Sequence, residues 1–217
     1  MTKVARRVDL RAHPEADLGE VVAHVRSGGL VAYPTETVYG LGGLCDPDAV
    51  RRLQRLKGRT ADKPIGVLVE SADAVDGLRW SEAARELADI FWPGSVTLVL
   101  EDPSGIFPEG VRSRLTSGVG VRVSPHPVVA RLLAAVAAPL TSTSLNVPGR
   151  PPAASGDAAI EVLEDLGGTD VWVLDVGRLP PSGPSTVVDC TGPEPIVIRE
   201  GTVPVGRLRC VLPGIHG

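Results

Sequence analysis

The sequence has few aromatic residues and few cysteines, and both shortages limit what it can be. Phe, Trp and Tyr make up 3% of the 217 residues, so Val, Leu, Ile and Ala must supply most of the core. Cys45, Cys190 and Cys210 are far apart and form no C-x-x-C pair, a pattern typical of reduced thiols in a cytoplasm rather than of a disulfide framework. The histidines are scattered too, so no zinc motif is recognisable.

Positive charge and long apolar runs are also lacking. The formal net charge is -4, which argues against a protein that coats nucleic acid through bulk charge, because such binding needs a basic face. A local basic pocket is still compatible with this charge. The N-terminus has no apolar segment of the kind found in signal peptides, and no uninterrupted stretch could span a bilayer. We therefore expect a soluble cytoplasmic protein.

Neither of two common phosphate-binding motifs occurs. The chain has no G-x-x-x-x-G-K-[ST] sequence, and no G-x-G-x-x-G follows the first predicted strand. The glycines of "YGLGG", residues 39–43, lack the spacing of either motif and by themselves favour a tight turn. Any nucleotide must therefore be held by side chains.

Strand patterns alternate with helical patterns along the chain, whose length suits one buried domain. The predicted helices cover residues 18–29, 46–59, 81–92, 126–137 and 156–168. The predicted strands cover residues 29–34, 64–70, 95–101, 119–123, 139–144, 171–175, 185–189 and 195–199. Because the last strands follow one another without helices between them, the predicted α/β sheet is mixed.

The stretch "RLKGRTADKP", residues 55–64, concentrates cations at the end of one predicted helix. Cations at a helix C-terminus offset the helix dipole and can simply be solvated. Alternatively, Gly58 breaks the helix, so that Lys57 and Arg59 can both turn toward an anion beyond the following strand. An ammonium beside a guanidinium suits a polyphosphate. The stretch alone leaves both interpretations open.

Two other stretches place hydroxyl groups at strand ends. "PLTSTSLNVPG" contains Ser142, Ser144 and Asn146. Such a run can form cross-strand hydrogen bonds at a sheet edge, or it can contribute to a ligand site beyond a strand of an α/β fold. "PTET", residues 34–37, directly follows the first predicted strand and by itself favours a turn.

Together and in order, these stretches resemble the YrdC-like family of threonylcarbamoyl-AMP synthases, from about residue 15 to about residue 203. The segments that carry the resemblance are "GLVAYPTETVYGLGG", "KGRTADKPI", "FWPGSVTLVL", "VGVRVSPHP", "TSTSLNVPG" and "STVVD" before "IVIREG". It implies a YrdC-like α/β fold, an open twisted mixed sheet with flanking helices around a basic cavity. We expect a single domain over residues 1–217, of the short type that lacks the extra C-terminal domain of the long form, with a tail over about 204–217.

The resemblance also implies a reaction. L-threonine, bicarbonate or CO2, and ATP would give threonylcarbamoyl-AMP and pyrophosphate, with Mg2+ accompanying the ATP. The product would supply the N6-threonylcarbamoyl group of adenosine 37 in tRNA, and a downstream threonylcarbamoyl transferase would make that transfer. We therefore expect tRNA to be contacted only indirectly or weakly, in agreement with the acidic net charge.

Residue roles follow from the resemblance position by position. The K-x-R and S-x-N signature implies that Lys57 and Arg59 are catalytic, because they would neutralise charge on the reacting phosphate. The implied ATP-binding residues are Lys57, Arg59, Lys63, Ser144, Asn146 and Arg199. The implied threonine-binding residues are Thr35, Arg122, Ser142 and Ser185. Strand alternation separately predicts that Arg122 and Gly120 face away from the valine-rich core side of their strand.

Three positions depart from the family pattern. Pro184 replaces a usual Glu, and Leu68 replaces a His that many long-form members carry near threonine. Leu145 replaces the common Ala of S-x-N and is expected to form a bulkier pocket wall.

Two alternative functions stay open. A carbamoyl-adenylate former would resemble the YrdC-like module of carbamoyltransferases, but the domains that accompany that module are absent from this sequence. An RNA-binding or ribosome-maturation factor would use the basic cavity, yet the net charge and the scarcity of aromatic residues weigh against it.

Overall fold

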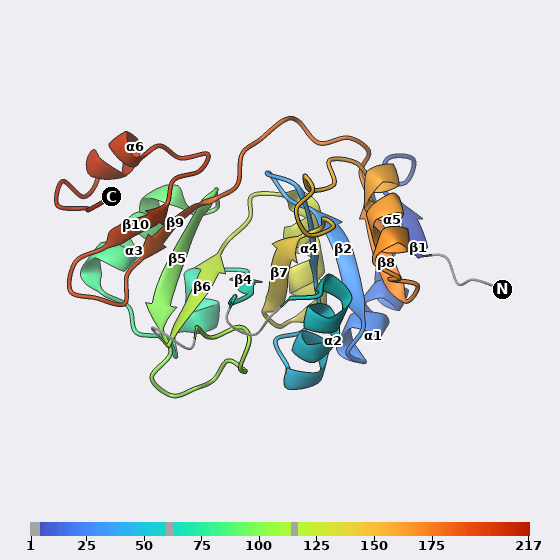
Figure 1. The fold of residues 1–217 in the computed structure, drawn as a ribbon, viewed down its shortest axis with the longest axis horizontal. Helices are drawn as coiled ribbons and strands as arrows, with labels where there is room; N and C mark the ends of the chain where they lie inside the picture. The colour runs from blue at the N-terminus through green and yellow to red at the C-terminus, as the bar shows by residue number, and fades with distance from the viewer. Residues whose placement is uncertain (1–4, 60–62, 114–116) are drawn as a thin grey trace.

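A mixed β-sheet forms the centre of the molecule (Figure 1). The computed structural model describes residues 5–59, 63–113 and 117–217, and within them ten strands form one sheet in the order β1-β8-β2-β3-β7-β4-β6-β5-β9-β10. The strands are β1 Arg6–Asp9, β2 Leu30–Pro34, β3 Tyr39–Gly42, β4 Gly66–Leu68, β5 Val96–Glu101, β6 Gly118–Arg122, β7 Leu140–Ser144, β8 Val171–Asp175, β9 Thr186–Asp189 and β10 Ile196–Arg199. Since β2 runs parallel to β8 and antiparallel to β3, the predicted mixed sheet is confirmed.

Helices flank this sheet. They are α1 Gly19–Arg26, α2 Pro47–Lys57, α3 Glu82–Phe91, α4 Pro127–Val136, α5 Gly156–Asp165 and α6 Val205–Arg209, with a short 3-10 helix over Ala72–Val75. Alternate residues of β2 separate two apolar clusters: Val31 and Tyr33 pack with α1 and α4, whereas Leu30 and Ala32 belong to the cluster that includes α2, α3 and α5. Helices therefore cover both faces of the sheet at β2.

The helix that precedes the cation-rich stretch begins and ends as the sequence predicts. The Asp46 side chain accepts hydrogen bonds from the backbone N–H groups of Asp48 and Ala49, at 2.9 and 3.0 Å, and so caps α2. Gly58 ends the helix with a left-handed φ of 55°, a conformation that glycine adopts without steric cost. This turn separates the directions of the two side chains beside it, Lys57 and Arg59.

The prediction of a tight turn at "YGLGG" is wrong, because residues 39–42 form strand β3 between β2 and β7. The glycines allow close packing within the sheet rather than a turn. A Cβ atom on Gly42 would lie 1.6 Å from the carbonyl oxygen of Thr141, and one on Gly40 would lie 2.8 Å from the Tyr33 ring.

The segment that was expected to be a tail, residues 204–217, packs against the sheet. It contains α6, and Leu208 and Ile215 are buried in the main apolar cluster. The backbone N–H of Val197 in β10 donates to the carbonyl oxygen of His216 at 2.7 Å, so this segment also pairs with the edge of the sheet. Within the described part of the chain, no helix is both long and apolar enough to cross a membrane.

Leu208→Ala should lower the free energy of unfolding by about 2–5 kcal/mol, because it leaves a cavity in the core. Urea denaturation, monitored by tryptophan fluorescence, measures the change. The exposed neighbour Arg207 provides the control, since Arg207→Ala should change stability by less than about 0.5 kcal/mol. An unchanged midpoint for Leu208→Ala would mean that the C-terminal segment adds nothing to the fold.

Candidate active site

A cavity of about 460 Å³ lies against the sheet between β3 and β10. Its described lining comes from strands β3, β4, β5, β6, β7, β9 and β10, from the loops after β2 and α2, and from the loops before β6 and β9. On β6 the cavity side carries Gly118, Gly120 and Arg122, while Val119 and Val121 are buried in the core. The alternation predicted from the sequence is therefore confirmed, and the small residues leave the space that a ligand would need.

Three arginines from three different parts of the chain line this cavity: Arg59, Arg122 and Arg199. Arg59 follows α2, and its Nε and Nη2 atoms donate to the carbonyl oxygens of Lys63 and Pro64, each at 2.8 Å. Asp189 is the one carboxylate among the described lining residues. A chain of net charge -4 thus has a locally basic cavity, which suits an anionic ligand.

Arg122 is paired with a carboxylate inside the protein. Its guanidinium donates to Oε1 of Glu36, in the loop after β2, and the exposed fractions of the two side chains are 10% and 17%. The other Glu36 oxygen accepts from the Ser124 hydroxyl at 2.7 Å, and Ser95 Oγ donates to Oε1 at 3.2 Å. Burial lowers the pKa of Arg122, and the adjacent Glu36 charge opposes that shift. Glu36 therefore fixes the guanidinium and helps to keep it charged.

Arg199 lines the cavity from the end of β10. Its Nε and Nη2 atoms donate to the carbonyl oxygen of Ser185 at 3.1 and 2.9 Å. The Ser185 hydroxyl bonds Arg199 Nη2 at 3.1 Å and the Thr97 hydroxyl at 2.9 Å. Burial, and then the nearby charge of Arg122, lower the pKa of Arg199. Two like charges thus face the same space, and a bound anion would relieve their repulsion.

The remaining hydroxyl groups of the predicted threonine site also reach the cavity. Thr35, which is 2% exposed, lines it, and its Oγ1 accepts from the backbone N–H of Thr37 at 3.2 Å and donates to the carbonyl oxygen of Val38 at 2.7 Å. Ser142 lines it from β7, beside the fully buried Thr141, whose hydroxyl bonds the backbone of Gly43. Because β7 lies between β3 and β4, the sheet-edge interpretation of the "TSTS" stretch is wrong, although the Thr141 hydroxyl does bond the neighbouring segment. Ser142 agrees with the interpretation as a ligand site.

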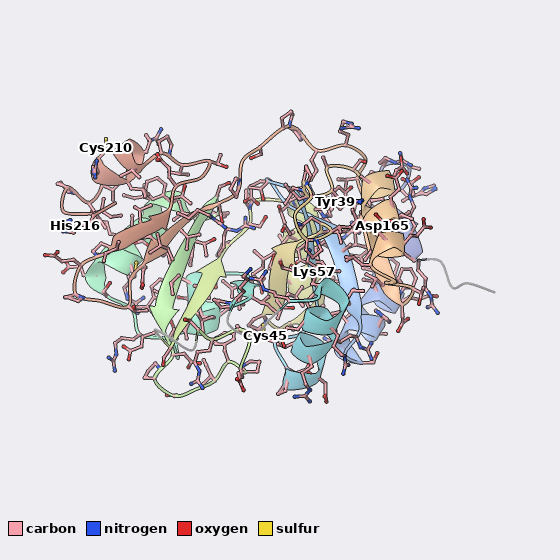
Figure 2. The ribbon with its side chains drawn as sticks, viewed as in Figure 1. Tyr39, Cys45, Lys57, Asp165, Cys210 and His216 are labelled. Atoms are coloured by element: carbon pink, nitrogen blue, oxygen red, sulfur yellow. The ribbon has the colours of Figure 1, made fainter. Side chains whose placement is uncertain are left out.

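Within each half of the K-x-R and S-x-N signature, one residue lines the cavity and the other does not. Arg59 and Ser144 line the cavity, but Lys57 and Asn146 do not. Lys57 lies at the end of α2 in the middle of the molecule (Figure 2) and is 6% exposed. Its Nζ donates to the carbonyl oxygens of Ser144 and Asn146 and to Asn146 Oδ1. In this arrangement the ammonium group points to the loop after β7 rather than into the cavity.

Comparisons with known proteins identify the family. The Sua5/YciO/YrdC family model, described as "Telomere recombination", matches residues 23–201. The chain belongs to this family. It is 35% identical, over 89% of its length and 58% of the relative's, to a threonylcarbamoyl-AMP synthase of Pyrococcus abyssi. It is 38% identical, over 88% of its length and 87% of the relative's, to a putative threonylcarbamoyl-AMP synthase of Mycobacterium tuberculosis.

Solved structures of the family share the fold. Sua5 of P. abyssi in complex with L-threonine has a TM-score of 0.84 and 32% identity over 98% of this chain and 62% of that one. YciO of Escherichia coli has a TM-score of 0.75 and 25% identity over 94% of this chain and 98% of that one. The predicted YrdC-like fold is therefore confirmed. The chain spans less than two thirds of the P. abyssi protein.

Most of the residues that the sequence singled out converge on the cavity. Seven line it: Thr35, Arg59, Arg122, Ser142, Ser144, Ser185 and Arg199. Lys57, Asn146 and the exposed Lys63 are not among the described lining residues. Lys63 instead offers its backbone carbonyl to Arg59, so a phosphate contact through its side chain stays a prediction.

The positions that depart from the family pattern have clear places. Leu145 is fully buried in the apolar cluster and does not line the cavity, so the expectation of a bulkier pocket wall is wrong. Pro184 lines the cavity, and its carbonyl accepts from the Thr202 N–H at 2.8 Å. Leu68 also lines it and pairs in register with Arg122 across β4 and β6.

Sequence reasoning missed several polar residues at the site. Thr97 lies on β5, where Val96, Leu98 and Leu100 are buried, so strand alternation could have found it. Asp189 ends the "STVVD" strand, in the position where ligand-binding residues of α/β folds often occur. Glu36 belongs to "PTET", but its pairing with Arg122 joins residues 86 positions apart, which no local pattern indicates.

The thiols of Cys45 and Cys190 are not activated as nucleophiles. All three cysteines are free, as the sequence predicts. Burial raises the pKa of the Cys190 thiol to about 12, with a further contribution from Asp189, and burial also raises that of Cys45. Both thiols are therefore protonated at neutral pH.

Glu36→Gln should lower the free energy of unfolding by about 1–3 kcal/mol, because the buried Arg122 loses its opposing charge. Thermal or urea denaturation measures the loss. Glu70→Gln, at an exposed position, is the matched control and should be neutral within about 0.5 kcal/mol. A Glu36→Gln variant as stable as the parent would show that Arg122 needs no internal counter-charge.

Proposed function

We propose that this chain is an L-threonylcarbamoyladenylate synthase, a nucleotidyltransferase that forms threonylcarbamoyl-AMP and pyrophosphate from L-threonine, bicarbonate or CO2, and ATP. The observation that carries the proposal is the convergence of Arg59, Arg122 and Arg199 on one cavity walled by hydroxyl groups and glycines. Two anionic substrates must be brought together for this reaction, and three fixed guanidinium groups suit that task. The names of the family relatives and the threonine complex of P. abyssi Sua5 support it.

Threonine would bind at the Arg122 side of the cavity. A guanidinium presents parallel N–H donors to a carboxylate, a geometry that an ammonium cannot reproduce. Glu36 already accepts from Nη1 of Arg122, so the threonine carboxylate would use the other N–H donors of the group. The hydroxyls of Thr35, Ser142 and Ser185 line the same space and can orient the amine and the side-chain hydroxyl of threonine.

The chemistry then needs little covalent participation by the protein. The threonine amine, as the free base, adds to CO2 and loses a proton, which gives a carbamate. A carbamate oxygen attacks the α-phosphorus of ATP, and the bond to the β-phosphate oxygen breaks to release pyrophosphate. Arg59, Ser144 and Arg199 would align the phosphates and neutralise the charge that develops on their oxygens.

A magnesium ion would enter with ATP. Within the described residues no group of three or more His, Cys, Asp or Glu side chains could hold a metal by itself. Asp189 at the cavity wall is compatible with an ion that is bound mainly by phosphate oxygens. When bound, Mg2+ would reduce the negative charge of the triphosphate, which would lie next to the protein's arginines.

The product fits a role in tRNA modification. Threonylcarbamoyl-AMP is a reactive mixed anhydride, so it needs a downstream transferase that accepts the threonylcarbamoyl group. We propose that this group is destined for adenosine 37 of tRNA and that tRNA contacts this chain only weakly. The net charge of -4 supports that division of labour, and the cytoplasm is the compartment in which ATP and tRNA meet.

Pyrophosphate release from ATP in the presence of bicarbonate tests the proposal. L-threonine and carbamoyl phosphate are added separately, and the adenylate product is identified by its mass. We expect release that depends on threonine and on bicarbonate. Release with carbamoyl phosphate alone would instead indicate a carbamoyl-adenylate former, and no release with either would favour the RNA-binding alternative.

Arg122→Lys should raise the KM for threonine roughly tenfold or more and leave the KM for ATP nearly unchanged, because the charge stays but the paired donors are lost. Steady-state kinetics of the same assay give both constants. Arg207→Lys on α6, outside the cavity lining, should change neither constant. An unchanged threonine KM would exclude Arg122 as the residue that binds the threonine carboxylate. If the melting temperature also fell, the role of Arg122 would be the structural ion pair with Glu36.

A further inference from the structure

The K-x-R and S-x-N signature contains two kinds of residue. Arg59 and Ser144 line the cavity, whereas Lys57 and Asn146 lie outside its described lining. The left-handed turn at Gly58 separates Lys57 from Arg59, since Lys57 ends α2 and Arg59 begins the loop that follows. Each half of the signature therefore supplies one residue to the cavity lining and one residue outside it, of which Lys57 is buried and Asn146 partly buried.

The hydrogen-bonding capacity of Lys57 is used entirely within the protein. An ammonium group has three N–H donors and no acceptor. The Nζ of Lys57 donates to Ser144 O at 3.0 Å, to Asn146 Oδ1 at 2.8 Å and to the carbonyl oxygen of Asn146. Burial, and then the charge of Arg59, lower its pKa to about 8, so the ammonium form still predominates at neutral pH. A phosphate could be bound only if Lys57 gave up one of these contacts.

Asn146 is satisfied in the same way. Its Oδ1 accepts from Lys57 Nζ and from the Ser144 hydroxyl, the latter at 2.9 Å. Its Nδ2 donates to the carbonyl oxygens of Val147 and Arg150 at 2.9 and 3.1 Å. The amide thus closes the loop that follows β7 and also fixes the hydroxyl of Ser144, which faces the cavity.

We propose that Lys57 and Asn146 are positioning residues that hold the 144–146 turn against the end of α2 and do not contact the nucleotide. Through this turn they place Ser144 opposite Arg59, the two signature residues that line the cavity. The inference rests on the proposed function in one respect, that ATP binds in the cavity. The placement of the turn itself is a property of the free protein.

The first measurement is hydrogen exchange of the free protein. The N–H of Leu145 donates to Tyr39 O at 2.9 Å, and that of Ala153 donates to Leu145 O at 2.8 Å, so both amides report on the turn. Lys57→Met and Asn146→Ala should each speed exchange in the peptide that covers residues 141–153 about tenfold or more. Arg59→Ala, which removes a cavity residue, should leave that exchange unchanged.

The second measurement is the Kd of ATP and of pyrophosphate, by calorimetry. Lys57→Met and Asn146→Ala should raise the Kd of a given ligand by the same factor as each other, about tenfold for ATP. The double variant should bind no more weakly than the weaker-binding single variant. For both variants, the relative loss of affinity for ATP and for pyrophosphate should match that of Ser144→Ala. The Arg59→Ala variant is the comparison for a lost direct contact.

The outcomes separate the two proposals. If Lys57→Met loses ATP and pyrophosphate binding while exchange in residues 141–153 stays at the parent rate, Lys57 contacts phosphate and the inference is overturned. Additive losses in the double variant would also overturn it. Faster exchange in both variants, in a parent protein that binds no ATP, would refute the proposed function and support the positioning role. If Lys57→Met does not fold, Asn146→Ala decides: parent-like exchange or an ATP Kd within twofold of the parent's contradicts the proposal.

Discussion

Three guanidinium groups share one cavity, and the like charges stay together because protein oxygens hold each of them. Carbonyl groups accept from Arg59 and from Arg199, and the Glu36 carboxylate accepts from Arg122. The cations therefore need no reorganisation when an anion arrives, and a preorganised site of this kind stabilises charge more effectively than mobile side chains do. Burial, and then the nearby charge of Arg122, lower the pKa of Arg199, so a bound anion also offsets an existing repulsion.

The sheet provides the space for that site through small residues. Gly40, Gly66 and Gly120 line the cavity from β3, β4 and β6. On β6 the same alternation that leaves Gly120 and Arg122 on the cavity side buries the intervening valine in the core. On β6 the fold and the site thus depend on one pattern, and a side chain at Gly120 would fill the cavity beside Thr97 rather than enter the core.

The sequence predicted what local patterns determine. The helix start near residue 46, the helix end at Gly58 and the orientation of Arg122 all depend on neighbouring residues, and all agree with the structure. What it did not predict depends on pairings between distant residues. Strand β3 exists because Gly42 can approach Thr141, and the direction of Lys57 depends on Asn146, which lies 89 positions further along the chain. Family resemblance identified the residues of the K-x-R and S-x-N signature. It did not distinguish Arg59 and Ser144, which line the cavity, from Lys57 and Asn146, which do not.

A crystal structure with L-threonine and a non-hydrolysable ATP analogue tests the central claim most directly. We predict that the threonine carboxylate lies on Arg122 and the phosphates beside Arg59 and Ser144. Lys57 Nζ should keep its bonds to the turn that contains Asn146. Ligands bound outside this cavity, or Lys57 Nζ turned to a phosphate oxygen, would contradict the account.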